Sequence, residues 1–193
     1  LYSPPRVTAE LGRLPNMSLT GGSTFDLRAD RHGKAWDFTK AQDRHEARAR
    51  IAAEKPYMVI GSPPCTSFSA LNVRWNYPKM DKREVKRRTA EGTLLLNFAI
   101  EIYELQLSAG RHFLHEHPLT ARSWKLPCVA DLLRHLAVNV AQVHMCQFRM
   151  MSHVDRPGGE MGLVKKPTGF MTSSRHIGMS STRGVTEEML MSP

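Results

Sequence analysis

Short apolar runs alternate along the chain with longer segments whose apolar residues have helical spacing. The apolar run at residues 57–60 is typical of a buried strand and stops at Gly61. Further along, apolar residues recur at spacings of three and four and predict a long helix with one buried stripe: Leu95, Phe98, Ile102 and Leu105. Alternation of strands with helices predicts an α/β layered domain with a mostly parallel central sheet.

The same kind of pattern predicts most of the remaining elements. Strands are expected at residues 23–27, 111–118, 138–148 and 165–173, the last as an edge strand. A first helix is expected to begin with Ser3 as its cap. A second is expected over residues 40–55, with Ala47 and Ile51 facing inward. A third is expected around four apolar residues with helical spacing: Val129, Leu132, Leu133 and Leu136. Residues 1–173 are therefore predicted to form one domain, followed by a polar tail at 174–193.

Length and composition limit the class of protein. The 193 residues suffice for one domain with its own core. No apolar run approaches the roughly 20 residues that a membrane helix needs, and no signal-peptide apolar region is present. The opening Leu1 is not an initiator methionine, and Leu1-Tyr2 is typical of a strand end. We therefore expect a piece, truncated at its N-terminus, of a longer polypeptide with neighbouring domains.

Charge and cysteine content add a partner and a compartment. The formal net charge of +9 favours a polyanionic partner such as nucleic acid. Six of the ten residues 79–88 are basic, among them Lys82, Arg83, Lys86 and Arg87. Such runs often only solvate a helix face, but beside a candidate active-site loop they favour phosphate contact. The 3 cysteines do not suggest a disulfide framework and favour a reducing compartment, intracellular and either nuclear or cytoplasmic.

Two residues are the main candidates for chemistry. Cys65 follows the strand at 57–60 on a turn stiffened by Pro63 and Pro64, at the edge where α/β sheets place their active sites. Glu116 lies near the end of the strand at 111–118, because Pro118 ends that strand. Both side chains are expected at the same C-terminal edge of the sheet.

Weaker signals suggest a nucleoside-binding site and, less well, a metal. Asp26 ends a predicted strand, where an acid can accept from ribose hydroxyls. Asp37 lies between two aromatic residues that could sandwich an adenine, although it could equally cap a helix, since Thr39 and Gln42 fit a capping box. Three histidines between 112 and 117 suggest zinc, but no second cluster accompanies them, so no metal is predicted.

Two motifs together carry a family resemblance. Residues 61–69 read GSPPCTSFS and residues 113–118 read FLHEHP. With both motifs the chain resembles the cytosine-5 DNA methyltransferases, which carry a Pro-Cys loop after the fourth strand and a Glu-Asn-Val type motif after the fifth. More closely, the whole chain is similar to methyltransferase-like segments of some retroelement polyproteins. The resemblance implies a Rossmann-like fold dependent on S-adenosylmethionine, with helices on both faces of the sheet.

The resemblance also implies roles for individual residues. Cys65 would add to carbon 6 of a cytosine lifted from the stack, Glu116 would hold the ring at N3 and its amino group, and carbon 5 would take the methyl group. The implied S-adenosylmethionine contacts are Ser3, Pro5, Asp26, Asp37 and Pro63. The implied nucleic-acid contacts are Ser69, Lys82, Arg83, Lys86, Arg87, Lys165 and Lys166, with DNA favoured over RNA.

The chain departs from the family pattern in several places. His117-Pro118 replaces Asn-Val, and Ser3-Pro4-Pro5 replaces the glycine-rich first loop. The family's Gln-Arg-Arg motif is absent, and Lys165 or Lys166 could substitute, although lysine lacks arginine's forked geometry. The short C-terminus leaves no room for a sizeable target-recognition domain. Two alternatives therefore stay open: amino-group methylation, which the cysteine disfavours, and a degenerate domain that binds nucleic acid without catalysis.

Overall fold

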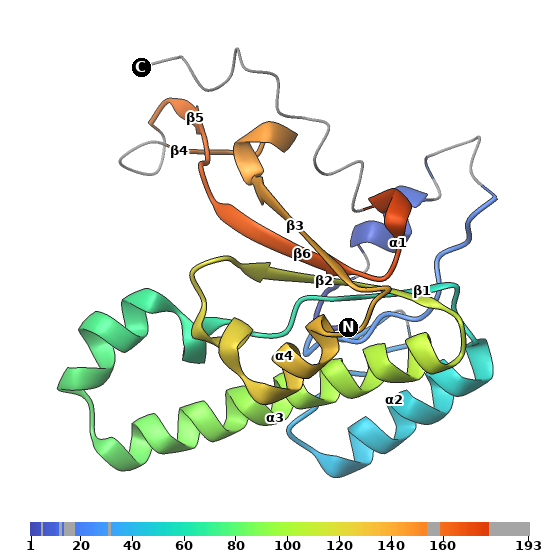
Figure 1. Cartoon of the computed structure of the whole chain (residues 1–193), viewed down its shortest axis with the longest axis horizontal. Coiled ribbons are helices and arrows are strands. Elements are labelled where there is room, and N and C mark those ends of the chain that lie inside the picture. The colour runs from blue at the N-terminus through green and yellow to red at the C-terminus, as the bar shows by residue number, and fades with distance from the viewer. Residues whose placement is uncertain (5, 12, 14–17, 31, 154–158, 178–193) are drawn as a thin grey trace.

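A mixed four-stranded sheet organises the structure, which is a computed structural model (Figure 1). It describes residues 1–193 except 5, 12, 14–17, 31, 154–158 and 178–193. The strands are β1 (Met58–Gly61), β2 (His112–Pro118), β3 (Asn139–His144) and β6 (Pro167–Thr172), in the order β1-β2-β6-β3. A separate hairpin pairs β4 (Met151–His153) with β5 (Met161–Leu163).

The strand directions correct the expectation of a mostly parallel sheet. Only β1 and β2 pair in parallel, whereas β6 pairs antiparallel with β2 on one side and with β3 on the other. The chain returns from β3 to β6 through the β4–β5 hairpin, and a return without a long crossover produces an antiparallel neighbour. The segment predicted as an edge strand is thus an interior strand of the sheet. The coarser prediction, a layered α/β domain, agrees with the structure.

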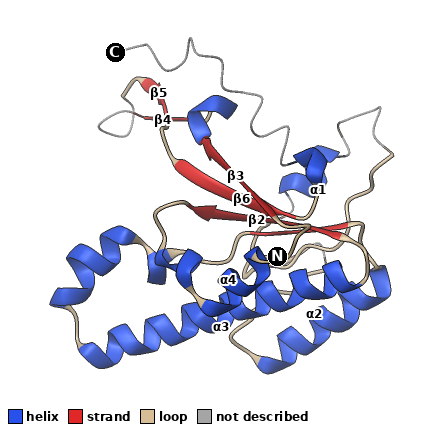
Figure 2. Cartoon of the chain, viewed as in Figure 1, coloured by secondary structure: helices blue, strands red, loops and turns tan. Residues whose placement is uncertain are grey.

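The helices are α1 (Arg6–Leu11), α2 (Ala41–Glu54), α3 (Lys82–Ser108) and α4 (Pro127–Leu133). Figures 1 and 2 show α2, α3 and α4 on one side of the sheet. The short α1 lies on the other side of the sheet in this view and buries none of its residues. Helices on both faces of the sheet were expected, and in the structure one face carries three helices whereas the other carries only the short α1 among the described residues. None of the helices in the described residues is long and apolar enough to cross a membrane.

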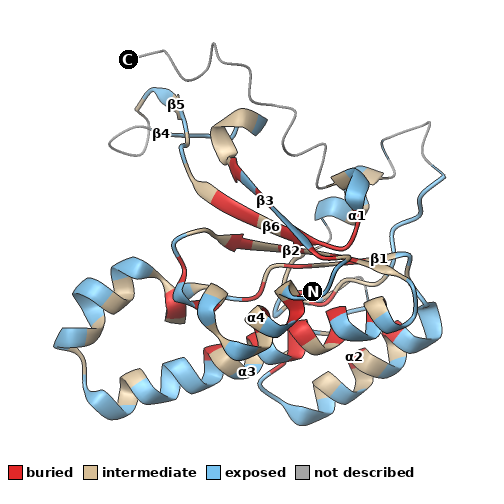
Figure 3. Ribbon diagram, viewed as in Figure 1, coloured by how far each residue is buried: buried red, intermediate tan, exposed pale blue. Residues whose placement is uncertain are grey.

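The core lies between β2 and α3 (Figure 3). Burial alternates along β2, so that Phe113, His115 and His117 face the helix side. On α3 the buried face includes Leu96 and Tyr103, and the rings of Tyr103 and Phe113 stack with centroids 4.6 Å apart. Removing this apolar surface from water is the main stabilising contribution of the fold.

Several predicted elements shift at their ends. Ala47 and Ile51 of α2 are buried as predicted. Leu105 is 49% exposed and Leu136 fully exposed, so neither belongs to the core. Periodicity alone places a stripe on a helix but cannot fix where the helix stops or how wide its buried face is. Cys146 lies in a 3₁₀ turn after β3 and is half-buried rather than buried.

Segments near the N-terminus extend the sheet beyond β1 through a few backbone hydrogen bonds. The Leu1 nitrogen donates to Ile60 O at 2.6 Å, and Tyr2 N donates to Phe25 O at 2.7 Å. Trp36 N then donates to Asp26 O at 2.8 Å. Residues 23–27 therefore lie extended beside the sheet but do not form the regular strand that the sequence predicts.

Candidate active site

The Cys65 loop leaves β1 and is held in place by a short turn. Cys65 has φ −91° and ψ −7° and precedes the 3₁₀ turn Thr66–Phe68, whose Phe68 N donates to Cys65 O at 2.9 Å. Phe68 is buried and anchors the turn in the core. The thiol itself is free and half-buried. The local backbone thus fixes a cysteine at the surface end of a buried strand, as the two prolines predict.

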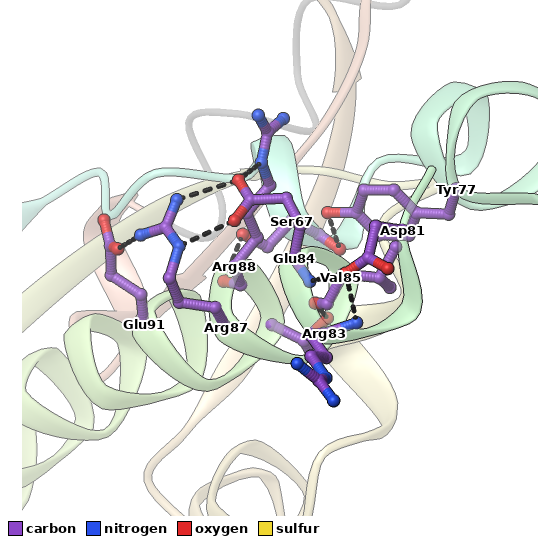
Figure 4. A network of polar contacts seen from close by, with 10 residues as sticks. Ser67, Tyr77, Asp81, Arg83, Glu84, Val85, Arg87, Arg88 and Glu91 are labelled. Atoms are coloured by element: carbon purple, nitrogen blue, oxygen red, sulfur yellow. Dashed lines mark hydrogen bonds and ion pairs between the residues drawn. The ribbon is translucent and has the colours of Figure 1, made fainter. Parts of the chain in front are cut away.

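The start of α3 holds the other side of this loop (Figure 4). Ser67 Oγ donates to Arg88 O at 2.9 Å, and Tyr77 Oη donates to Ser67 O at 3.2 Å. Contact is this close because position 92 of α3 is glycine. A Cβ there would lie 2.7 Å from Ser67 Oγ and 2.8 Å from Ser67 Cβ. Gly92 therefore allows the loop and the helix to touch.

Glu116 lies on the face of β2 opposite the buried histidines. Its carboxylate oxygen Oε1 is 3.3 Å from Lys166 Nζ, which comes from the residue just before β6. The two side chains are 24% and 42% exposed, respectively, so water still reaches the pair. One of the two lysines considered as substitutes for the missing arginines thus contacts the candidate glutamate, and the contact is a single hydrogen bond rather than a fork.

The strand register brings the Cys65 loop and Glu116 to the same sheet edge. In the parallel β1–β2 ladder Gly61 is level with His115. Glu116 is one residue beyond that level on β2, and Cys65 lies four residues after Gly61, in the loop that leaves β1. The register thus places the ends of both strands at one edge of the sheet.

A cavity of about 870 Å³ adjoins one side of the Cys65 loop. Its size lies within the range of sites for small molecules and cofactors. Its walls come from the N-terminal segments, the Cys65 loop and α3, and include Tyr2, Asp26, Asp37, Thr39, Ser62, Pro64, Thr66, Ser67, Arg87, Arg88, Glu91 and Gly92. Cys65 and Glu116 are not wall residues, although the residues on either side of Cys65, Pro64 and Thr66, both are.

Asp26 and Asp37, two of the residues for which the resemblance implies a cofactor contact, both border this cavity. One oxygen of Asp26 accepts from Arg28 N at 2.9 Å. Asp37 Oδ1 accepts from Thr39 N at 3.0 Å and from Thr39 Oγ1 at 2.6 Å, which lowers the pKa of the carboxyl and keeps it ionised. The predicted capping box is not formed, because α2 begins at Ala41 with Lys40 as its cap residue.

The flanking aromatic rings do not form the expected adenine sandwich. Trp36 and Phe38 are only 3% and 2% exposed. Their centroids are 6.4 Å apart at an interplanar angle of 45°, and Phe38 packs on Phe98 at 4.7 Å. This leaves no parallel slot for a base between the two rings. They form an apolar wall of the cavity from within the core.

The remaining residues expected at the cofactor differ in position. Ser3 Oγ donates to Pro4 O at 3.1 Å, and α1 starts at Arg6, so Ser3 does not begin the helix. Pro63 is buried, and its neighbour Pro64 borders the cavity instead. Pro5 lies outside the described residues.

Part of the basic strip at the start of α3 is already neutralised (Figure 4). Arg87 forms a bidentate pair with Glu84 at 2.8 and 2.9 Å and contacts Glu91 at 3.0 Å. Arg88 also reaches Glu84, at 2.6 Å. These arginines lower the pKa of Glu84 to about 2. Arg87 therefore lies at the cavity wall as one partner of an ion-pair network rather than as a free phosphate ligand.

The other expected nucleic-acid contacts are distributed around the site. Lys82, Arg83 and Lys86 are exposed on the first turns of α3, and Lys165 is exposed just before β6. Ser69 Oγ accepts from Asn72 N at 3.3 Å within the loop. Of these, the α3 residues and Ser69 lie along the chain segment that leaves the Cys65 loop.

Two of the three histidines of β2, His115 and His117, are core residues. His115 and His117 stack with centroids 5.2 Å apart and meet Trp124 edge-on. Burial lowers the pKa of His115 to about 3 and that of His117 to about 4, so both are neutral near pH 7. Among the described residues no group of three or more His, Cys, Asp or Glu could hold a metal ion.

Several wall residues of the cavity were not predicted. Tyr2 and Thr39 carry sequence signals for a strand end and a helix cap but none for a cavity wall. Gly92 does carry a signal for close packing, because a lone glycine inside a strong helical pattern often marks a close approach.

Comparisons of the chain with protein-family models, curated proteins and solved structures find no match.

Proposed function

We propose that this chain is a cytosine-5 methyltransferase-like domain that uses Cys65 as nucleophile and S-adenosylmethionine as methyl donor. The proposed substrate is cytosine in DNA. The observation that carries the proposal is the register of β1 and β2, which brings the Cys65 loop and Glu116 to one sheet edge beside a cavity. A thiol, a carboxylate and a cofactor-sized cavity are the three parts that this chemistry requires.

The donor site is proposed to be the cavity between the N-terminal segments and α3. Its volume of about 870 Å³ suits a nucleoside-sized ligand. Asp26 and Asp37 offer carboxylates for ribose hydroxyls and for an amino group, and Trp36 and Phe38 supply an apolar wall. S-adenosylmethionine would contribute an electrophilic sulfonium methyl group there. The chain's own residues then have to bind and hold the cytosine.

In this proposal the thiolate of Cys65 adds to carbon 6 of an extruded cytosine, which makes carbon 5 electron-rich. Glu116 holds the ring at N3 and the amino group, and Lys166 holds Glu116 through the 3.3 Å contact. After methylation, loss of the carbon 5 proton to a base returns the electron pair to the ring, and the Cys65 sulfur leaves as thiolate. The base must leave the duplex for this reaction, at a cost of a few kcal/mol.

A second candidate function is nucleic-acid binding without catalysis, by a degenerate domain within a larger polyprotein. The observation that favours it is the single-point Lys166 contact, where the family has arginines with forked geometry. The exposed basic residues of α3 serve a binding module equally well. Amino-group methylation stays less favoured because the residue after Pro64 is a cysteine.

Two measurements test the proposal. Calorimetric titration with S-adenosylmethionine tests the cavity, and an Asp37→Ala variant is expected to weaken the binding.

Covalent trapping on a duplex with 5-fluorocytosine tests the nucleophile. Cys65→Ser is expected to abolish trapping and to leave duplex affinity within a few-fold, whereas Cys128→Ser, the matched control, is expected to trap normally. Binding that is salt-sensitive but never covalent would favour the degenerate domain. Trapping that persists in Cys65→Ser would remove Cys65 from the mechanism.

A further inference from the structure

A π-helical turn with an exposed aromatic side chain follows the Cys65 loop directly. The turn spans Asn72–Asn76, and π-helical turns are rare and frequent at functional sites. Trp75 within it is 56% exposed, and Leu71 just before it is 70% exposed. Trp75 and Leu71 together offer large apolar side chains on the surface, where a binding partner would cover them.

The turn is attached firmly to the Cys65 loop. Asn72 Nδ2 donates to Thr66 O at 2.7 Å, and Asn76 Nδ2 donates to Asn72 Oδ1 at 2.6 Å. At the other end Tyr77 Oη donates to Ser67 O at 3.2 Å. The aromatic side chain is therefore displayed from a fixed support at the sheet edge of the candidate site. A pre-ordered ring loses little entropy when a ligand covers it.

One cation lies near the ring, and three more basic residues follow it in the sequence. The Arg74 guanidinium lies 5.5 Å from the centroid of the Trp75 ring. Lys82, Arg83 and Lys86, all exposed, follow on the first turns of α3. None of these three side chains forms an ion pair among the described residues, in contrast with Arg87 and Arg88. An aromatic face with arginine and several unpaired cations suits a polyanion that also carries flat rings.

We propose that Trp75 is a stacking platform for an unpaired base of a nucleic-acid strand whose phosphates contact Lys82, Arg83 and Lys86. The inference rests on the proposed function in taking DNA as the ligand. Stacking on Trp75 and phosphate contact with the basic residues do not require that function. Aromatic side chains with basic neighbours bind single strands in this way, largely independent of sequence. Trp75 would then hold the strand beside the base that enters the site at Cys65.

The test separates stacking from charge. Fluorescence anisotropy is measured with a labelled 20-nucleotide oligothymidine and with an abasic oligomer of equal length, which has the phosphates but no bases. Trp75→Ala is expected to weaken oligothymidine binding about tenfold and to leave abasic binding unchanged. Trp75→Phe is expected to keep most of the affinity. The paired substitutions Lys82→Ala and Lys86→Ala are expected to weaken binding of both oligomers and to reduce the salt dependence.

Tyr57→Ala is the matched control, because Tyr57 is also an exposed aromatic residue, at 63%, but precedes β1 at the opposite end of that strand. All measurements use the Cys65→Ser background without a methyl donor, so a failure of catalysis does not alter them. Equal weakening of both oligomers by Trp75→Ala, or none, would overturn the proposal. So would a Trp75-dependent change from dimer to monomer in sedimentation, which would assign the surface to a second copy of the chain.

Discussion

Lys166 and Glu116 form an ion pair whose Nζ and Oε1 atoms are 3.3 Å apart, although the two residues lie 50 positions apart in the sequence. Glu116 belongs to β2, and Lys166 immediately precedes β6, its antiparallel neighbour. Pairing of the two strands brings the two segments together, and the side chains span the remaining offset, because Glu116 is level with Phe170, four residues from Lys166. In the proposed mechanism this contact orients the carboxylate that holds the base.

Removing the partner of Glu116 is expected to affect rate far more than stability. An ion pair this accessible to water contributes about 1 kcal/mol or less to folding. Lys166→Ala is therefore expected to leave the melting temperature nearly unchanged. Misplacing the carboxylate is expected to slow methyl transfer by about 10- to 100-fold. Glu116→Gln is expected to cut turnover by orders of magnitude with little loss of affinity for S-adenosylmethionine in calorimetry.

Lys165 provides the matched control for this prediction. It is exposed and adjacent in sequence, and it has no ion pair within the described residues. Lys165→Ala is expected to keep the wild-type rate, and Lys166→Arg to recover part of the lost rate. Equal losses in Lys165→Ala and Lys166→Ala would mean that the lysines act through general charge and not by holding Glu116.

Gly92→Ala is expected to displace the Cys65 loop. In an exposed helix this change would stabilise the protein by about 1 kcal/mol. Here the new methyl group would lie 2.7 Å from Ser67 Oγ, and overpacking of this kind costs about 1–3 kcal/mol. We expect no gain in stability and a changed rate of Cys65 alkylation, measured by mass spectrometry.

The double variant Gly92→Ala with Ser67→Gly checks that explanation. Removing the Ser67 side chain clears the atoms that the new methyl group would meet at 2.7 and 2.8 Å. The double variant is therefore expected to alkylate Cys65 closer to the wild-type rate than Gly92→Ala alone. If Ser67→Gly brings no recovery, the contact between loop and helix does not control the thiol.

Local patterns predicted the parts of the fold that depend on neighbouring residues. The inward positions of α2 and the two faces of β2 follow from periods of 3.6 and 2, which the sequence displays directly. The interior position of β6 could not be predicted in this way, because it depends on pairing with segments far away in the chain. The same reason hid which lysine reaches Glu116.

For the candidate site, the sequence could indicate only where the two strands end. Cys65 follows β1 and Glu116 lies near the end of β2, and these two strands are parallel neighbours in register. The aromatic residues misled the prediction, because an apolar ring beside an acid signals a ligand wall and a core residue equally well. Trp36 and Phe38 lie in the core, and only packing with other parts of the chain, such as that of Phe38 on Phe98 of α3, could decide this.

Releasing the arginines at the start of α3 is expected to strengthen nucleic-acid binding. Glu84 neutralises Arg87 and Arg88 through hydrogen bonds of 2.6 to 2.9 Å. Glu84→Gln removes one negative charge, which releases Arg88 and leaves Arg87 with Glu91 as its remaining ion-pair partner. We expect a higher affinity for duplex DNA at low salt and a steeper decrease of log affinity with log salt, by about one to two charges. The control variant is Glu101→Gln. Glu101 lies further along α3 and pairs with Arg48 of α2, and its replacement should leave the salt dependence unaltered.

Stability is expected to decrease with acid because of the two buried histidines. Burial lowers the pKa of His115 to about 3 and of His117 to about 4, against an ordinary value near 6.5. Below pH 6.5 the unfolded chain therefore binds two protons that the folded chain does not, and the free energy of unfolding falls as the pH falls towards 4. Where one such histidine is fully protonated in the unfolded chain and neutral in the folded chain, it lowers the free energy of unfolding by about 1.4 kcal/mol for each unit of pH decrease.

Replacing one of the two histidines should remove one of these protons. Both ring nitrogens of His117 are buried without a hydrogen-bond partner in the described residues, so an apolar side chain of similar size leaves no new group unsatisfied. Urea unfolding of His117→Leu between pH 6.5 and 4.5 is expected to show about half the wild-type slope of unfolding free energy against pH. The exposed control His45→Gln should retain the full slope. An unchanged slope in His117→Leu would show that His117 is already protonated in the folded chain or stays neutral in the unfolded one.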